Sequence, residues 1–284
     1  TAMSCNSSIV FYNQGLKFPY DLLKLIKKYK ISILNLSISS FRILKNYLNK
    51  KEKLNCPRIV MSGGMQYSIN DFNNFKMTFP KAKLINFYGC TENSPRISHC
   101  ILKKKYLYNG YFPVGTPIKN VKIKILKSKS KNTKYGKIFI SGKSLMSGYF
   151  NHQNLNKIKF KKKWFETGDL GFFKNKQLYL MGREDNIFTV GHEKLCPEEI
   201  ESILQKRFKF SDVIILKKKD SILNWHPVCA IKKEKGQKIN KTKVLEFCQK
   251  NFSSFKIPRK ITFLQKIPKT KYGKIDRKKV LTLI

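Results

Sequence analysis

The sequence predicts an α/β protein with a β-rich central part and a small α+β unit at its C-terminal end. Three observations carry this prediction. Before Gly110, strand-like runs that end at glycine alternate with amphipathic helices. After Gly110 the apolar runs become short and β-like, with turns between them. After Arg183, strand and helix patterns alternate again over about a hundred residues, the size of a small domain.

The first layer follows from the spacing of its apolar residues. Residues 22–29 place Leu22, Leu25, Ile26 and Tyr29 on one face of a basic helix, and residues 31–37 alternate as a strand does. Phe41, Leu44 and Leu48 indicate a second helix. Two further strands, at 58–61 and 83–88, end at Ser62-Gly63-Gly64 and at Gly89.

The later elements are predicted in the same way. Short β runs occupy residues 121–126, 137–141 and 177–181. Pro197 opens a helix that continues to Leu204, with Glu198 and Glu199 in the first turn, where the helix dipole favours acids. Strands at 211–216, 225–231 and 260–263 and a helix at 241–252 complete this unit.

The charge of the chain first suggests a nucleic-acid partner. It has 59 Lys and Arg against 17 Asp and Glu among 284 residues, a formal net charge of +42. Most of these cations are lysines spread along the chain, whereas direct base recognition depends mainly on arginine. Abundant Lys, Asn and Ile with little Ala also fit AT-rich codon usage. We therefore favour a solvated lysine-rich surface and predict no specific nucleic-acid partner.

Several common site types are excluded. Residues 136–144 resemble a phosphate-binding P-loop but have five residues between the glycines where the motif needs four. There is no GxSxG elbow, no HxxxH pair and no CxxC pair among the seven cysteines. No apolar run approaches the ~20 residues of a membrane span, and no signal peptide is visible, so we expect a cytoplasmic protein.

Chemistry-bearing residues gather in a few short segments. Tyr88-Gly89-Cys90-Thr91-Glu92 follows a predicted strand, at the edge where α/β sheets bind ligands. A Thr–Glu pair there could bind a phosphate and a magnesium ion. Asp169 lies between Gly168 and Gly171 and could accept hydrogen bonds from two sugar hydroxyls.

Two further segments lie nearer the C-terminus. Asp185, in Gly182-Arg183-Glu184-Asp185-Asn186, lies where the character of the sequence changes, so it is a candidate hinge. Pro268 to Arg277 offers Lys274 beside a glycine, where it could neutralise phosphate or carboxylate charge. A plain turn or a basic tail is the alternative for each segment taken alone.

In their order, these segments resemble the motifs of the adenylate-forming enzyme superfamily, which includes acyl-CoA synthetases, peptide-synthetase adenylation domains and luciferases. The YGxTE, TGD, GRxD and PKTxxGKxxR patterns all match, together with PxEIE at 197–201. The resemblance implies the C-terminal part of a large α/β nucleotide-binding domain over 1–184. This comprises an α/β layer at 1–110 and a β-rich subdomain at 111–184. A C-terminal lid at 186–284 would follow, hinged at Asp185.

The resemblance also implies an activity and its cofactors. Such enzymes use ATP and Mg²⁺ to convert a carboxylic acid to an acyl-adenylate. They then transfer the acyl group to a thiol acceptor, coenzyme A or a carrier-protein pantetheine. We expect a non-amino acid substrate, with a fatty or aryl acid favoured, because no aspartate lies between Phe11 and Pro19 to pair with an amino group.

Each site role is carried over to a matching residue. Tyr88, with Gly89, would stack on adenine, Thr91 would contact phosphate and Glu92 would hold magnesium. Asp169 and Arg183 would bind the ribose, and Lys274 would be the adenylation lysine. Gly63 and Gly64 would border the acyl pocket, and the Gly191 loop would face the thiol tunnel after the lid rotates.

One departure concerns the family's Ser/Thr/Gly-rich phosphate loop, which the sequence lacks. We therefore expect the chain alone to bind ATP poorly. Three explanations stay open: a fragment of a longer synthetase, one half of a split gene whose partner is a separate N-terminal half, or a remnant. The alternative function is that of a catalytically inactive or basic polyanion-binding protein.

Overall fold

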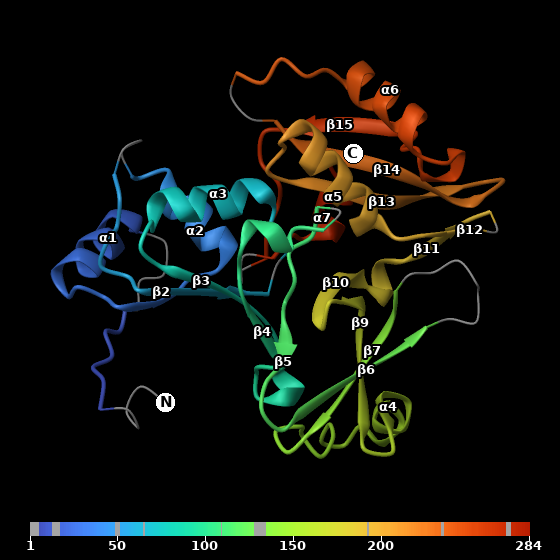
Figure 1. Ribbon diagram of the computed structural model, residues 1–284. Coiled ribbons are helices and arrows are strands. Elements are labelled where there is room, and N and C mark those ends of the chain that lie inside the picture. Colours follow the sequence, from blue (N-terminus) through green and yellow to red (C-terminus); the bar gives the residue numbers. More distant parts are fainter. Residues whose placement is uncertain are drawn as a thin grey trace.

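The computed structural model describes residues 6–12, 18–48, 52–64, 66–108, 110–127, 135–191, 193–233, 236–270 and 274–284. These residues form two five-stranded sheets, a two-stranded ribbon and a three-stranded sheet with helices on it (Figure 1). Lys271, Tyr272 and Gly273 of the segment from Pro268 to Arg277, and His192 after Gly191, lie outside the described residues.

The first sheet carries three helices on one face (Figure 1). Its first three strands are parallel and its last two are antiparallel, in the order β1 (Ile33–Asn35), β2 (Ile59–Gly63), β3 (Lys83–Tyr88), β4 (Ser98–Ile101) and β5 (Thr116–Pro117). The helices are α1 (Pro19–Lys28), α2 (Ile38–Lys45) and α3 (Ile69–Thr78). Phe41 and Phe75 stack at 3.7 Å between ring centroids and fill the core above Val60 and Leu84. The sheet extends past residue 110 because β5 pairs with the edge strand β4.

The opposite face of this sheet is only partly covered. Successive side chains on a strand point to opposite faces, so Met61 and Phe87 lie on the face away from Val60 and Leu84. Met61 and Phe87 are partly buried, whereas Ile33 and Ile101 are 53% and 43% exposed. The β2–β3 register places Gly63 directly beside Phe87.

The second sheet is antiparallel and forms the β-rich part. Its strands run in the order β10 (Gln177–Arg183), β9 (Trp164–Lys174), β7 (Gly136–Gly142) and β6 (Val121–Lys127), with β8 (Phe160–Lys161) paired to β9 and α4 (Gln153–Lys159) before it. Ile138, Ile140, Phe165 and Leu178 fill its core. Tyr88 from the first sheet joins this cluster, so the two sheets meet at the end of β3.

The C-terminal part begins after a 3₁₀ turn at Glu184–Asn186. It consists of a β ribbon, a three-stranded sheet and three helices: β11 (Phe188–Val190), β12 (Glu193–Leu195), α5 (Pro197–Phe208), β13 (Val213–Asp220), β14 (Asn224–Lys232), α6 (Lys241–Asn251), β15 (Lys260–Leu264) and α7 (Arg277–Leu281). Ile200, Val213, Cys229 and Val244 are fully buried between the helices and the sheet.

The predicted α/β class is confirmed, and the predicted strands and helices appear within a few residues of their expected bounds. The sequence did not predict the helices α3, α4 and α7, the long strand β9, or the short strands β4, β5, β8, β11 and β12. In α3, Ser68 and Asp71 form a capping box, but Asn and Thr dilute its apolar periodicity. The segment around Asp169 has a strand's length despite its glycines, because β7 and β10 pair with it on both sides. The proposed division at Asp185 stays a prediction.

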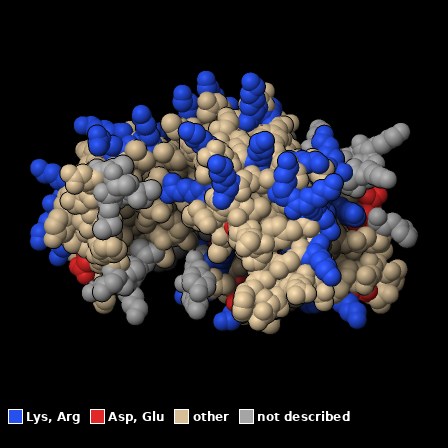
Figure 2. All heavy atoms as spheres, turned by 90° about the horizontal axis from the view of Figure 1, so that it is seen from below, with Lys and Arg blue, Asp and Glu red and all other residues tan. Residues whose placement is uncertain are grey.

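Charge is distributed over the surface. Figure 2 shows lysine and arginine side chains along the edges and across one face, with uncharged surface between them. This pattern agrees with a solvated surface. Within the described ranges, no helix combines the length and the apolar character that a bilayer crossing needs.

Candidate active site

Three of the predicted segments meet in one hydrogen-bond network. Tyr88 Oη donates to Asp169 Oδ2 at 2.5 Å, although 81 residues separate them in the sequence. Arg183 Nη1 donates to Asp169 Oδ1 at 3.3 Å and Arg183 Nη2 to Asp185 Oδ2 at 3.0 Å. The structure thus brings together the residues that the sequence proposed for adenine, ribose and hinge.

The strands explain this placement. Asp169 and Arg183 are directly opposed across β9 and β10, after a register irregularity between Leu180 and Gly182. Gly168 has φ +76°, in the left-handed region, and a Cβ there would lie 3.1 Å from Arg183 Nη2. Thr167 holds the turn, since its hydroxyl donates to Ile138 O at 3.0 Å and accepts from Asp169 N at 3.1 Å.

Tyr88 is nearly buried, with 6% of its surface exposed. Burial, followed by the nearby Asp169 carboxylate, raises the pKa of Tyr88 well above its usual value. The phenol therefore remains a neutral donor at any physiological pH. Its contacts support an orienting role towards Asp169 more directly than stacking on a base.

Glu92 lies beside this network. Tyr149 Oη donates to Glu92 Oε1 at 2.7 Å, and Met146 N donates to Glu92 O at 2.8 Å. Burial acts to raise the pKa of Glu92. The hydrogen bonds from Tyr149, the backbone and Cys90, together with Arg183, outweigh burial and lower this pKa below its ordinary value. Glu92 is therefore an ionised, partly exposed carboxylate.

The turn after β3 is tightly folded. A Cβ on Gly89 would lie 1.5 Å from Pro95 O, so no larger residue fits there. Thr91 is exposed at the start of a 3₁₀ turn, and Asn93 Nδ2 donates to Arg96 O at 2.9 Å. This turn presents Thr91 and Glu92 at the carboxyl end of β3, as the sequence predicts.

The remaining predicted residues lie apart from the network. Gly63 ends β2, and the exposed Gly64 follows it with φ +78°. Gly191, with φ +59°, forms the turn between β11 and β12, and its N–H donates to Leu223 O. Asp185 is exposed in the 3₁₀ turn between β10 and β11.

Lys274 is exposed at the base of a hairpin near the C-terminus. Thr270 N donates to Lys274 O at 2.7 Å, and Lys269 pairs with Ile275. Lys269 Nζ lies 4.0 Å from Asp212, which itself binds Arg42 on α2. The hairpin therefore begins beside the first α/β layer, while the Lys274 ammonium forms no ion pair with any residue in the described ranges.

Sequence reasoning missed three supporting residues. Tyr149 donates to Glu92 from 57 residues further along the chain. Thr167 was seen as part of a motif but not as the support of Asp169. Arg277, the last residue of the final motif, donates to Glu201 at 2.8 Å and to Ile215 O at 2.8 Å, so it anchors α7 to β13 and α5.

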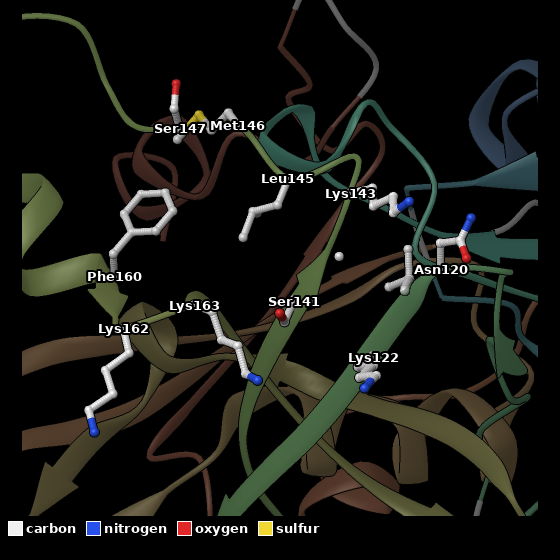
Figure 3. A pocket seen from close by; sticks show the side chains of 12 residues that line it. Asn120, Lys122, Ser141, Lys143, Leu145, Met146, Ser147, Phe160, Lys162 and Lys163 are labelled. Atoms are coloured by element: carbon white, nitrogen blue, oxygen red, sulfur yellow. The ribbon is translucent and has the colours of Figure 1, made fainter.

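A separate groove of about 750 Å³ lies on the second sheet. Figure 3 shows Leu145, Met146 and Phe160 on its apolar side and Lys122, Lys143, Lys162 and Lys163 around it. None of the predicted site residues lines this groove. One link to the site is the loop that carries Met146, whose N–H donates to Glu92 O.

The Tyr88–Asp169–Arg183 network lies where the two sheets meet, and comparison with known proteins identifies the family. The family model described as AMP-binding enzyme matches residues 1–150, more than half of the chain. The chain belongs to the AMP-binding enzyme family. Its fold is that of the C-terminal part of adenylate-forming enzymes.

Two curated members from Humulus lupulus are similar in sequence. The chain is 30% identical over 274 residues to 4-coumarate–CoA ligase CCL1, which covers 90% of this chain and 48% of that protein. It is 33% identical over 144 residues to the probable CoA ligase CCL9, over 50% of this chain and 27% of that protein. The chain therefore spans about half the length of the first of these relatives.

Solved AMP-binding structures share the fold. ATP-bound MatB from Rhodopseudomonas palustris superposes with a TM-score of 0.84 at 20% identity, covering 99% of this chain and 55% of that one. The anthranilate CoA ligase AuaEII, in complex with anthranoyl-AMP, gives 0.79 at 21% identity, covering 98% and 54%.

Proposed function

We propose that the chain provides the C-terminal half of the active site of an ATP-dependent ligase, which activates a carboxylic acid as its acyl-adenylate and then forms a thioester. The observation that carries the proposal is the Tyr88–Asp169–Arg183 network, with Glu92 on the adjacent turn. It unites three motifs that are distant in the sequence. Membership of the AMP-binding family supports the same reaction class.

The nucleotide would be held by the network. Asp169 would accept hydrogen bonds from the ribose hydroxyls, because each carboxylate oxygen has a lone pair beyond those used by Tyr88 and Arg183. Tyr88 would orient Asp169, with the adenine placed against its ring and Gly89. The exposed Thr91 hydroxyl would donate to a phosphate oxygen.

The Glu92 carboxylate fits a magnesium ion, which prefers one or two carboxylates together with phosphate oxygens and water. It is ionised, partly exposed and held in place by Tyr149. No group of three or more His, Cys, Asp or Glu that could hold a metal occurs in the described ranges, so phosphates would supply further ligands. The ion would reduce the negative charge that repels an incoming carboxylate.

Lys274 would act in the first half-reaction. A carboxylate oxygen of the substrate would attack the α-phosphorus, the bond to the β-phosphate oxygen would break, and pyrophosphate would leave. The Lys274 ammonium would bridge the carboxylate and the α-phosphate and stabilise their charge. Its exposed position, with no ion pair inside the described part of the chain, leaves it available for this contact.

The second half-reaction would need the lid to rotate about Asp185, so that the Gly191 turn replaces Lys274. The thiol acceptor would be coenzyme A, as the names of the plant ligases suggest for those proteins, or a carrier-protein pantetheine. Gly63 and Gly64 would border the acyl pocket. A separate N-terminal half and a cytoplasmic location stay predictions.

The proposal is tested by carboxylate-dependent exchange of labelled pyrophosphate into ATP. The chain is assayed alone and mixed with the N-terminal half of a related ligase, because relatives are about twice as long. Lys274→Ala should abolish exchange. Lys278→Ala, which removes an exposed lysine from α7, is the matched control and should leave exchange unchanged.

The outcome also separates this proposal from its alternative. Exchange that survives Lys274→Ala would overturn the role of Lys274. An inactive, polyanion-binding protein would instead show no exchange in any mixture and a salt-steep affinity for heparin or DNA. The dispersed lysines in Figure 2 do not favour this alternative.

A further inference from the structure

Arg96 forms no ion pair with a carboxylate in the described part of the chain. The Arg96 guanidinium lies 4.7 Å above the Phe87 ring, and its Nη1 approaches Met61 Sδ at 3.6 Å. Both are weak partners for a cation with five N–H donors. The side chain is partly buried, and none of the described acids forms an ion pair with it.

The other arginines of the chain are accounted for. Four of them bind carboxylates: Arg42, Arg183, Arg259 and Arg277. The other two, Arg58 and Arg207, are exposed to solvent. Arg96 alone combines partial burial with donors that no described carboxylate satisfies.

Arg96 is held at the open face of the first sheet. Phe87 and Met61 belong to the face of β2 and β3 opposite the helices, so their contacts place the guanidinium there. The close approach of Gly89 to Pro95 and the Asn93–Arg96 hydrogen bond fix the backbone that carries it. The same turn carries Glu92, so one rigid segment supplies a carboxylate and a cation four residues apart.

Phe87 shapes the same place. Its ring lies so close to Gly63 that a Cβ on that glycine would be 2.6 Å from the ring, so the ring fills the space beside the end of β2. An acid that enters along Gly63 and Gly64 would meet the Phe87 ring and then Arg96.

We propose that Arg96 binds a second anionic group of the acid that this site activates, namely a second carboxylate, and that Phe87 limits the acid to a short chain. This inference rests on the proposed function, since it takes the Gly63–Gly64 edge as the acyl side of the site. A guanidinium binds a carboxylate with two parallel hydrogen bonds, which the Met61 sulfur and the Phe87 ring cannot replace.

The same geometry disfavours a long aliphatic acid. Its tail would cover the guanidinium and remove water from it without offering an acceptor, which is costly for a charged group. The proposed substrate is therefore a short dicarboxylic acid, in place of the fatty or aryl acid expected from the sequence.

The test uses pairs of acids of equal length in isothermal titration calorimetry with the 284-residue chain in the presence of AMP. Glutarate is compared with pentanoate, and malonate, succinate and adipate define the length limit. We expect glutarate or a shorter diacid to bind at least about tenfold more tightly than the monoacid of equal length, as a charge-assisted hydrogen bond predicts. Equal affinity for both members of each pair, or no binding of any diacid, overturns the inference.

Variants separate recognition from a structural role. Arg96→Gln should remove the preference for the diacid and leave pentanoate binding unchanged, and Arg96→Lys should restore part of it. Phe87→Ala should move the optimum towards a longer diacid. A diacid preference that persists in Arg96→Gln overturns the role of Arg96.

AMP binding is measured in the same samples to keep the two proposals apart. If AMP binds and no diacid preference exists, the inference on Arg96 fails while the nucleotide site stands. If diacids bind and AMP binding does not depend on Asp169, the proposed function fails.

Discussion

Replacing Tyr88 by phenylalanine removes one hydroxyl from the site and leaves the aromatic ring in place. The hydroxyl donates at 2.5 Å to Asp169, whose side chain is only 16% exposed. A hydrogen bond to a charged group contributes about 1.5–3 kcal/mol. Asp169 keeps its ion pair with Arg183 at 3.3 Å. The Arg183 side chain is 48% exposed, so solvent screens this pair, and the pair replaces the lost hydrogen bond only in part.

The expected effect is a loss of orientation at Asp169. Since ~1.4 kcal/mol corresponds to a tenfold change in an equilibrium constant, AMP affinity should fall by about tenfold and by no more than about a hundredfold. The assay is calorimetric titration of AMP into the native chain, Tyr88→Phe, Asp169→Asn and the double variant. Tyr88→Leu, which loses both ring and hydroxyl, reports the contribution of stacking.

The double variant decides the mechanism. If the hydroxyl acts through Asp169, Tyr88→Phe should cost little once Asp169→Asn has removed the charge, so the two effects will not add. Additive losses would refute the reasoning, because they would mean that Tyr88 and Asp169 act on the nucleotide independently. Full AMP affinity in Tyr88→Phe, with a loss only in Tyr88→Leu, would assign Tyr88 to stacking alone.

Three further predictions follow from the described contacts. Arg42→Met leaves the nearly buried Asp71 and Asp212 without their shared cation and should cost about 3–5 kcal/mol in urea unfolding. Arg58→Met at an exposed site is its control and should stay within ~0.5 kcal/mol of the native chain. Gly168→Ala and Gly236→Ala share backbone strain at φ +76° and +79°, about 1–2 kcal/mol each, but only Gly168→Ala should weaken AMP binding, because only its Cβ approaches Arg183. Burial raises the pKa of Glu201 to about 7, so the folded protein holds this proton more tightly than the unfolded chain. The resulting contribution to the free energy of unfolding is present below the unfolded pKa near 4.5 and is lost as pH rises through 7. Glu201→Gln should flatten this dependence in unfolding midpoints measured from pH 4.5 to 7.5, and an unchanged slope would contradict it.

Local sequence signals were sufficient for the elements with strong periodicity. The strand Lys83–Tyr88 and the Pro197 helix were predicted because a buried strand and an acid-capped helix each carry their pattern in consecutive residues. The candidate site residues were proposed for a different reason, the order of short motifs along the chain. Neither source predicts that Asp169 and Arg183 are cross-strand neighbours, because register depends on which strands pair.

Contacts between distant segments could not be predicted from the sequence for the same reason. Arg42 binds Asp71 through Nε and Nη2 and Asp212 through Nη1 at 2.8 Å, across 170 residues in the second case. Asp212 lies in the C-terminal part, so this pair joins α2 to the proposed lid. Phe87 against Gly63 is likewise a consequence of the parallel β2–β3 register, and Arg96 lies above Phe87 because the turn after β3 folds back.

The acids are more informative than the cations in this chain. With 59 Lys and Arg and only 17 Asp and Glu, a lysine near any surface point needs no explanation, whereas the position of a carboxylate does. Most acids form ion pairs. Five of them lie at the Tyr88 network, in the turn after β10 and in the C-terminal part: Asp169, Asp185, Asp212, Glu198 and Glu201. An exposed lysine without an acidic partner is therefore unremarkable, because water solvates it. A partly buried cation has lost part of that water and needs another partner. Arg96 is partly buried and forms no ion pair with a described acid, and for this reason we look for its carboxylate on a ligand.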